Sequence, residues 1–355
     1  MSIRSRLVPY ALRVMRGEVR PGQLVNLARS RLLPKGEVIS WQPTHLSIFT
    51  TNRCNFRCDM CPTHSRKVPE NYLHRHGDAP DMTLDILRLV LERYSKAIRL
   101  QLIGTGEPLL NSQLWEMARE GARRKMVVET ISNGYVLDEY IPELVRSDFD
   151  RICISINGHN DEEFQRITGN PSKHYTKILF NVEALVQKRN IKRSPLKIEV
   201  SFILDRYNYH YMREMIGVGE KLGADRVILN NFLPSPYAGL TPEEKCLYED
   251  ETIREEFRRA ASERLRCKVI WPFLLGKTQS ARKICNMPFN TLQVDGDGNV
   301  GGCSVMLLNM KGNGSIWDKD PWNNSFFRDL RKRHLEGNLL WPCRYCCGSI
   351  GVTVF

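Results

Sequence analysis

The sequence contains no uninterrupted apolar run of the ~18 residues that a membrane-spanning helix needs. Its start does not resemble a secretory signal, because Arg4, Arg6, Arg13 and Arg16 interrupt the apolar residues. Zinc-finger, RNA-recognition and helix-turn-helix patterns are also missing. These absences predict a cytoplasmic protein that neither spans a membrane nor uses a common nucleic-acid-binding module.

Disulfide bonds are not expected either, although the 355-residue chain has 11 cysteines. Eight of them fall into two groups whose spacing is typical of metal ligands, so metal binding in a reducing cytoplasm is the simpler interpretation. The composition, with 42% hydrophobic and 26% charged residues, is that of an ordinary globular protein. The length is sufficient for one large core and a smaller module.

The formal net charge of +12 is spread along the whole chain rather than gathered in one tract. Such a charge favours anionic partners. Since no nucleic-acid-binding pattern accompanies it, we expect an anionic small molecule rather than a nucleic acid.

The first cysteine group is the C-x3-C-x2-C run of Cys54, Cys58 and Cys61. Three thiols in one short loop cannot all pair in disulfides, and the next cysteine is Cys153. Three soft thiolates suit an iron–sulfur cluster with one open iron better than zinc, because structural zinc takes a fourth protein ligand. Two alternatives stay open: a zinc loop completed by His64, and free thiols.

Around this loop the chain alternates between strand and helix patterns. Six such units predict a parallel sheet closed into a partial (β/α)6 TIM-like barrel over residues 44–233. Right-handed crossovers bring the carboxyl ends of parallel strands to one rim. The residues predicted to face one cavity there are the cysteine loop, Glu107, Asn133, Ser155, Arg206 and Asn230.

Three further regions flank the predicted barrel. Residues 1–43 form a basic extension with two amphipathic helices, which either cover one end of the barrel or dock on a membrane or an acidic carrier. Residues 234–280 are interrupted by prolines and contain a charged helix, so we expect a connector with a solvated helix. Residues 281–355 contain the second cysteine group and predict a small domain of a β-hairpin and a helix.

In this second group, the Asp-Gly pairs of residues 295–298 predict a tight hairpin turn that places Cys285 and Cys303 on neighbouring strands. Cys343 and Cys346 follow a predicted helix at residues 326–335. Four thiolates suffice for a complete iron–sulfur cluster, and a zinc site with the same ligands is the alternative. Cys347 is an alternative ligand to Cys346, because the two are adjacent.

The cysteine loop, with Phe56 before its second cysteine, resembles the signature of radical S-adenosylmethionine (SAM) enzymes. The resemblance implies that Cys54, Cys58 and Cys61 hold a [4Fe–4S] cluster whose open iron binds SAM, which is cleaved to a 5′-deoxyadenosyl radical. Gly104, Thr105, Gly106 and Glu107 match the family's SAM-binding GGE motif, in which Thr105 replaces the common Gly. Further contacts with SAM are implied for Asn133 and Ser155, and the strand-end positions of Arg206 and Asn230 make them candidate contacts as well.

The C-terminal region resembles the twitch extension of these enzymes, a short relative of the SPASM domain. This implies an auxiliary [4Fe–4S] cluster on Cys285, Cys303, Cys343 and Cys346 or Cys347, which accepts an electron during a net oxidation. The expected substrate is a small polar, anionic molecule such as a sugar, cyclitol or nucleotide. An electron donor such as flavodoxin or ferredoxin is also implied. The base that accepts the substrate's proton is not identified.

Other functions remain open from the sequence. The radical could instead drive a redox-neutral decarboxylation, epimerisation or carbon–carbon bond formation, or modify a ribosomal peptide. A zinc-binding adaptor without catalysis is the alternative from another class, but it leaves the Gly104–Glu107 turn and the strand–helix repetition unexplained.

Overall fold

In the described part of the chain, a nine-stranded sheet runs in the order β10-β9-β1-β2-β3-β4-β5-β6-β7. The structure is a computed structural model that describes residues 17, 19–68, 80–232, 242–276, 284–310 and 312–355. Only β10 is antiparallel to its neighbour. The predicted barrel strands are confirmed. The bounds are β1 His45–Phe49, β2 Arg99–Ile103, β3 Val127–Ser132, β4 Arg151–Ser155, β5 Lys197–Leu204, β6 Arg226–Asn231, β7 Lys268–Ile270, β9 Thr291–Val294 and β10 Val300–Gly301.

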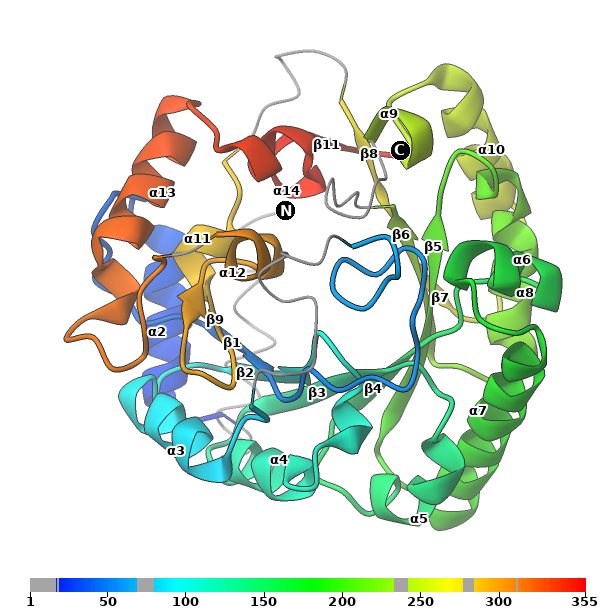
Figure 1. Ribbon diagram of the computed structural model, residues 1–355, viewed down its shortest axis with the longest axis horizontal. Helices are drawn as coiled ribbons and strands as arrows, with labels where there is room; N and C mark the ends of the chain where they lie inside the picture. The colour runs from blue at the N-terminus through cyan, green and yellow to red at the C-terminus, as the bar shows by residue number, and fades with distance from the viewer. Residues whose placement is uncertain (1–16, 18, 69–79, 233–241, 277–283, 311) are drawn as a thin grey trace.

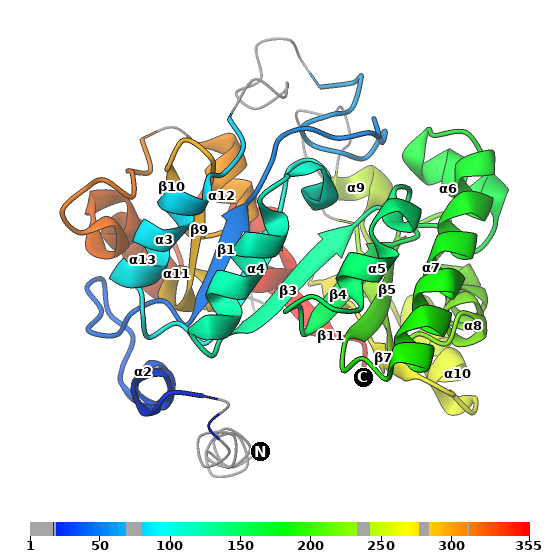
Figure 2. The ribbon, with the colours of Figure 1, turned by 90° about the horizontal axis from the view of Figure 1, so that it is seen from below.

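Helices surround the outer face of this curved sheet (Figures 1 and 2). The helix at residues 326–335 is confirmed as α13. The α-helices are α2 Pro21–Leu32, α3 Leu84–Arg93, α4 Leu114–Arg123, α5 Ile141–Leu144, α6 Asp161–Thr168, α7 Lys173–Lys192, α8 Met212–Lys221, α9 Pro242–Lys245, α10 Glu251–Ser262, α11 Met287–Asn290, α12 Ser304–Asn309, α13 Ser325–Glu336 and α14 Cys347–Ile350. Two short 3-10 helices, η6 Pro321–Asn323 and η7 Trp341–Tyr345, flank α13.

Alternate side chains of the barrel strands pack outward against these helices. A Cβ on Gly121 in α4 would lie 2.6 Å from Leu100 and 2.9 Å from Val128. A Cβ on Gly219 in α8 would lie 2.3 Å from Val227. Because successive side chains of a strand point to opposite faces, the residues between them face the inside of the barrel, called the lumen below. These inward positions are largely polar: Arg99, Gln101, Glu129, Arg151, Ser155, Glu199, Ser201, Arg226 and Asn230.

The two ends of the sheet differ from the sequence-based expectation. The predicted connector contributes a seventh parallel strand, because β7 pairs with β6. The predicted hairpin is present, but its strand β9 pairs in parallel with β1, so it extends the barrel sheet. A second sheet pairs β8 (Phe273–Leu275) with β11 (Gly351–Thr353), which ties the connector to the C-terminal residues (Figure 1).

The prediction that Cys285 and Cys303 lie on neighbouring strands is wrong. Cys285 precedes α11, because Pro288 starts a helical turn before β9 begins. Cys303 follows β10 and is the N-cap of α12. The two cysteines therefore lie just outside the hairpin strands, Cys285 before β9 and Cys303 after β10.

The N-terminal helix α2 packs against the amino-terminal ends of the barrel strands with a polar face. Gln23 Nε2 donates to the carbonyl oxygens of Ala97 (2.7 Å) and Arg124 (3.1 Å), which precede β2 and β3. The first of the two predicted N-terminal helices lies outside the described residues. Among the described residues, α-helices fall short of the length and apolar character required to traverse a lipid bilayer.

Candidate active site

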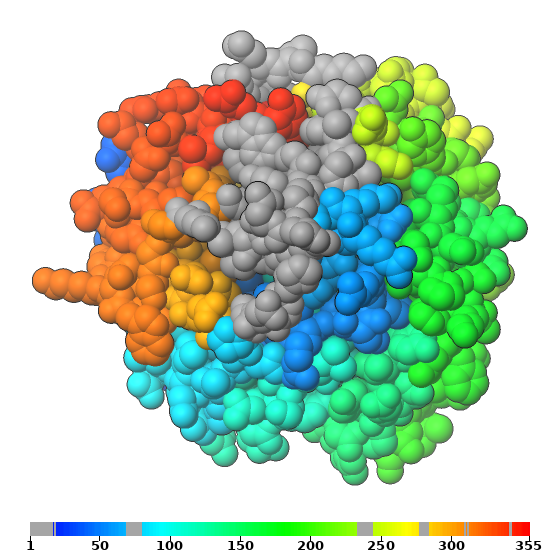
Figure 3. Space-filling view, in the orientation of Figure 1, coloured from blue at the N-terminus to red at the C-terminus, as the bar shows by residue number. Residues whose placement is uncertain are grey.

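The loop after β1 carries Cys54, Cys58 and Cys61 at the rim of the lumen. Each sulfur accepts a hydrogen bond from an N–H group: Cys54 from the amide of Phe56 (3.4 Å), Cys61 from the amide of His64 (3.3 Å), and Cys58 from the Asn170 side chain (3.2 Å). On the face shown in Figure 3, this blue segment lies at the surface beside the green helices.

Burial raises the pKa of Cys54 to about 11 and that of Cys58 to about 12. Repulsion from Cys61 raises both pKa values further, which indicates that the three sulfurs lie near one another. A metal centre would favour the thiolates that this environment disfavours.

Aromatic packing fixes the loop from behind. The buried ring of Phe56 stacks on His174 at 5.4 Å between ring centroids and also contacts Tyr135 and Phe164. Asn170, which follows α6, was missed by the sequence analysis. It is 112 residues away from Cys58, and no local pattern marks it.

The turn of Gly104, Thr105, Gly106 and Glu107 follows β2 and stacks backbone to backbone on the cysteine loop. The Gly106 amide donates to the Thr51 carbonyl at 3.1 Å, and the Glu107 amide donates to the Arg53 carbonyl at 2.8 Å. A Cβ on Gly106 would lie only 2.0 Å from that Arg53 oxygen. This close approach requires glycine, and it joins the two motifs that the sequence separates by more than 40 residues.

The Glu107 side chain is buried, with 1% exposure, and does not project freely into the lumen. Its carboxylate accepts from the backbone amides of Asn133 (2.7 Å) and Leu109 (3.2 Å). Burial raises the pKa of Glu107 to about 7 against the opposing effect of these hydrogen bonds. Asn133 also donates through its side chain to Asn55 in the cysteine loop at 2.7 Å. The hydrogen bonds of Glu107 and Asn133 thus connect the turn, the end of β3 and the cysteine loop.

The other predicted contacts lie on or just after β4, β5 and β6. Ser155 ends β4 and Asn230 lies near the end of β6, both on the lumen face. Arg206 lies beyond β5 with an exposed side chain, and its backbone amide donates to the Lys245 carbonyl at 3.0 Å.

A pocket of about 300 Å³ opens between the cysteine loop and the β9–β10 turn. Thr105 lines it, and the buried Thr105 hydroxyl has no hydrogen-bond partner in the part of the chain that the structure describes. The other lining residues are Phe49, Thr51, Asn52, Pro80, Asp295, Gly296, Leu307 and Leu308. The pocket lining thus mixes polar and apolar side chains.

The second cysteine group converges near Gly348. A Cβ on Gly348 would lie 2.9 Å from the Cys285 sulfur and 3.5 Å from the Cys346 sulfur. Burial, followed by repulsion from Cys346 and Cys285, raises the pKa of Cys303 to about 12. Burial, with repulsion from the other three thiols, also raises the pKa of Cys343. These four cysteines are therefore mutual neighbours.

Cys347 differs from them, because its sulfur donates to the Phe273 carbonyl of β8 at 3.5 Å. His334 of α13, which the sequence analysis missed, is buried with its Nε2 3.6 Å from the Cys343 sulfur.

Residues 48–216 match the family model of the Radical SAM superfamily. These residues form a radical SAM domain. The family implies a [4Fe–4S] cluster and SAM. In the described residues, no three His, Cys, Asp or Glu side chains converge on a single metal ion. Three cysteine thiols in one short loop are the ligand type that an iron–sulfur cluster takes. The N–H donor on each sulfur also fits such a cluster.

Two curated relatives illustrate the similarity. The tungsten-containing aldehyde ferredoxin oxidoreductase cofactor-modifying protein of Pyrococcus furiosus is 27% identical over 205 residues, which cover 56% of this chain and 53% of that protein. A probable GTP 3′,8-cyclase of Archaeoglobus fulgidus is 25% identical over 228 residues, which cover 62% and 69% of the two chains. The chain thus spans about half the length of the first relative.

The fold is also found in solved structures of radical SAM enzymes. Streptococcus suis SuiB bound to precursor peptide SuiA superimposes with a TM-score of 0.62 at 12% identity, over 87% of this chain and 70% of SuiB. At this identity the likeness concerns the fold alone.

Proposed function

We propose that this radical SAM protein oxidises a small polar, anionic substrate by hydrogen-atom abstraction and passes one electron to an auxiliary [4Fe–4S] cluster. When bound, the first cluster and SAM supply a 5′-deoxyadenosyl radical. The observation that carries the oxidative part is the grouping of four cysteines: Cys285 and Cys346 lie beside Gly348, and the thiols of Cys303 and Cys343 interact electrostatically with both. Four protein ligands leave no open iron, which suits electron transfer better than substrate binding.

The residues of the chain have distinct tasks in this proposal. Cys54, Cys58 and Cys61 hold the first cluster, and Asn170 orients the Cys58 sulfur. The backbone of the Gly104–Glu107 turn faces the SAM amino group, with Glu107 holding that turn in place. Ser155, Arg206 and Asn230 remain predicted contacts with SAM. The electron donor and the cytoplasmic location also remain predictions.

The first experiment tests radical initiation. After anaerobic reconstitution, Cys58→Ala should form no 5′-deoxyadenosine, because the cluster loses one of three ligands. The matched control is Cys267→Ala, which removes a half-buried thiol outside both groups and should cleave SAM normally. Formation of 5′-deoxyadenosine at the wild-type rate by Cys58→Ala would contradict the assignment.

The second experiment tests the auxiliary cluster. Cys303→Ser should retain SAM cleavage and iron at the first site but lose about half of the total iron and the net oxidation. If Cys303→Ser keeps the full iron content, these cysteines do not hold a cluster.

A redox-neutral reaction is the second candidate, because one relative is named a GTP 3′,8-cyclase. Product analysis separates the two: an oxidation yields a product two hydrogen atoms poorer than its substrate, whereas a redox-neutral cyclisation, an epimerisation or a decarboxylation does not show this pattern. Transfer of deuterium from labelled candidate substrates into 5′-deoxyadenosine identifies which compounds react.

A further inference from the structure

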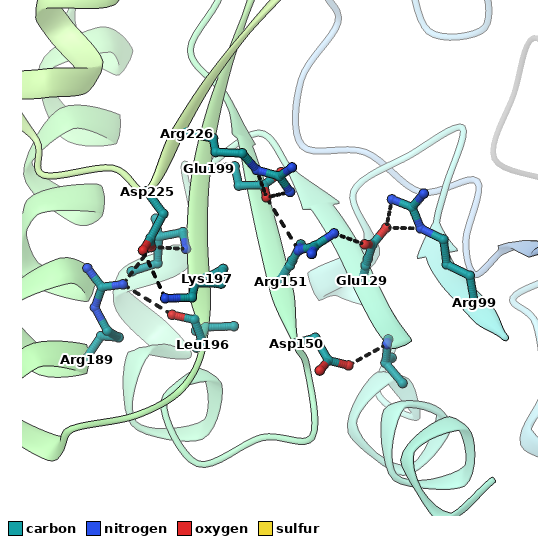
Figure 4. Close-up of polar contacts among 12 residues, drawn as sticks. Arg99, Glu129, Asp150, Arg151, Arg189, Leu196, Lys197, Glu199, Asp225 and Arg226 are labelled. Atoms are coloured by element: carbon teal, nitrogen blue, oxygen red, sulfur yellow. Dashed lines mark hydrogen bonds and ion pairs between the residues drawn. The ribbon is translucent and has the colours of Figure 1, made fainter. Parts of the chain in front are cut away.

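A continuous row of ion pairs crosses the lumen side of the barrel near the amino-terminal ends of its strands (Figure 4). Each of five neighbouring strands contributes one residue, and the charges alternate in sign. Glu129 accepts from Arg99 Nε at 2.7 Å and from Arg151 Nη1 at 2.9 Å. Glu199 accepts from Arg226 Nε at 2.6 Å and lies 3.7 Å from Arg151 Nε. We call these five residues the lumen floor.

The lumen floor faces inward because its strand neighbours face outward. Leu100 and Val128 pack on Gly121 of α4, and Val227 packs on Gly219 of α8. Arg99, Glu129 and Arg226 are adjacent to these residues in sequence, so they lie on the opposite face of the sheet. The row therefore lines the inside of the barrel, below the cysteine loop.

Exposure within the row is uneven. The carboxylate side chains of Glu129 and Glu199 are 8% and 6% exposed, whereas the arginine side chains Arg99 and Arg151 are 37% and 36% exposed. The carboxylates of Glu129 and Glu199 each already form ion pairs with two arginines. The surface of the row that remains accessible thus comes mainly from arginine side chains, and three arginines against two glutamates leave a surplus positive charge.

One residue beside the row adds to this positive potential, and another is neutral. Lys268 of β7 is paired in register with Arg226, so it lies on the same face, and it has no ion-pair partner among the described residues. His45 of β1 is paired in register with Arg99. Burial and then the charges of Arg99 and Arg31 lower the pKa of His45 to about 4, so its imidazole is neutral and does not add a competing cation.

Two inward positions near the carboxyl ends of the strands, above this row, are open to solvent. Ile131, the residue before the last in β3, lies on the inward face, yet it is 40% exposed. Asn230 of β6 is exposed on the same face. The interior of a barrel that serves only as a packed core is dominated by branched apolar side chains. Here polar and exposed positions replace them, which is typical of a ligand cavity.

We propose that the lumen floor binds an oxyanion of the substrate, a phosphate or a carboxylate, through Arg99 and Arg151 with Lys268. This inference rests on the proposed function, because it assumes that the substrate enters the lumen next to SAM. The planar guanidinium fork matches the paired oxygens of both anions. Arg151 stands at the centre of the row and is the principal contact.

The position of the floor also constrains substrate length. Arg151 and Ser155 lie at opposite ends of β4, four residues apart, which corresponds to about 13 Å at ~3.3 Å per residue. The atom that loses hydrogen lies near the Ser155 end, where SAM is expected. The anionic group must therefore be separated from that atom by most of this length, less the reach of an arginine side chain.

The test is isothermal titration of the SAM-bound, anaerobically reconstituted protein with inorganic pyrophosphate and, separately, malonate at constant ionic strength. We expect saturable binding of at least one probe. Arg151→Gln should weaken it about tenfold or more, as expected for a lost charge-assisted hydrogen bond. Lys268→Gln should weaken it severalfold, and Arg151→Lys should restore part of the affinity. Binding of pyrophosphate alone assigns a phosphate; binding of malonate alone assigns a carboxylate.

Arg189→Gln is the matched control. Arg189 of α7 pairs with Asp225 at 2.7 Å in the helix layer, so its loss removes a similar ion pair but no lumen cation (Figure 4). It should bind the probes as the wild type does. Lys268→Gln decides the outcome if Arg151→Gln does not fold, because Lys268 forms no ion pair with another described residue. The proposal is overturned if neither probe binds, or if the foldable floor variants bind as tightly as wild type. The titration requires no turnover, so its failure is distinct from failed SAM cleavage.

Discussion

Arg331 of α13 is fully buried, with 0% exposure, and it holds the scaffold of the second cysteine group. Its guanidinium donates to the carbonyl oxygens of Pro288 (2.9 Å), Glu37 (3.1 Å) and Trp322 (2.7 Å). It also donates to the Asn323 side chain at 2.8 Å. Burial lowers its pKa to about 9, so the group still carries its proton at neutral pH. Arg331→Lys should therefore break a network that no single ammonium can replace.

The size of the effect follows from these contacts. A hydrogen bond from a charged donor contributes about 1.5–3 kcal/mol. Arg331 makes its four hydrogen bonds through three different nitrogens, and Nη1 makes two of them. A lysine ammonium has one nitrogen and can replace only one of the three, so at least two of the four bonds are lost. We therefore expect Arg331→Lys to lower the free energy of unfolding by about 3–6 kcal/mol. Because Pro288 lies three residues after Cys285, we also expect the variant to reconstitute with about half the iron of the wild type.

The assay is urea unfolding of the reduced, cluster-free protein, followed by iron analysis after anaerobic reconstitution. Arg333→Lys on the same helix is the matched control. Arg333 pairs with Asp329 at 2.6 Å and is 34% exposed, so its replacement should cost less than about 1 kcal/mol. If Arg331→Lys unfolds within about 0.5 kcal/mol of the wild type, the network does not hold this region and the reasoning is wrong.

Three further predictions concern the two cysteine groups. Cys346→Ser should lose the auxiliary iron, whereas Cys347→Ser should keep it, because the Cys347 sulfur points to β8. Iron analysis of both variants checks this. The reverse result would make Cys347 the ligand in place of Cys346. Gly106→Ala should abolish SAM binding, since its Cβ would lie 2.0 Å from the Arg53 carbonyl oxygen; a wild-type dissociation constant would refute the required close approach. Glu107→Ala should weaken SAM binding about tenfold or more, because the backbone amides of Leu109 and Asn133 lose their acceptor. An unchanged SAM dissociation constant in equilibrium dialysis would show that the turn keeps its conformation without the Glu107 carboxylate.

Sequence patterns were sufficient to predict the strands, helices and turns that depend on residues close together in the chain. The six barrel strands, helix α13 and the hairpin turn were predicted because their signals are apolar alternation, helical periodicity and Asp-Gly pairs. The same holds for the cysteine loop and the Gly104–Glu107 turn, whose short spacing is itself the signal. The two short strands β7 and β8 were not predicted, because three residues are too few to show a period.

Contacts between distant segments were decided by the tertiary structure. Asn170 reaches the Cys58 sulfur across 112 residues, and an asparagine after a helix carries no local mark of that role. The lumen floor likewise consists of ordinary charged residues in five separate strands, and only their register places Arg151 between Glu129 and Glu199.

The sequence by itself determined which segments become strands and helices and where the cysteine loop lies, because those properties follow from local side-chain periodicity. The choice between Cys346 and Cys347 and the charge of the lumen floor were decided only when the chain folded. Both depend on the direction in which a side chain points relative to a segment far away, and packing rather than local sequence sets that direction.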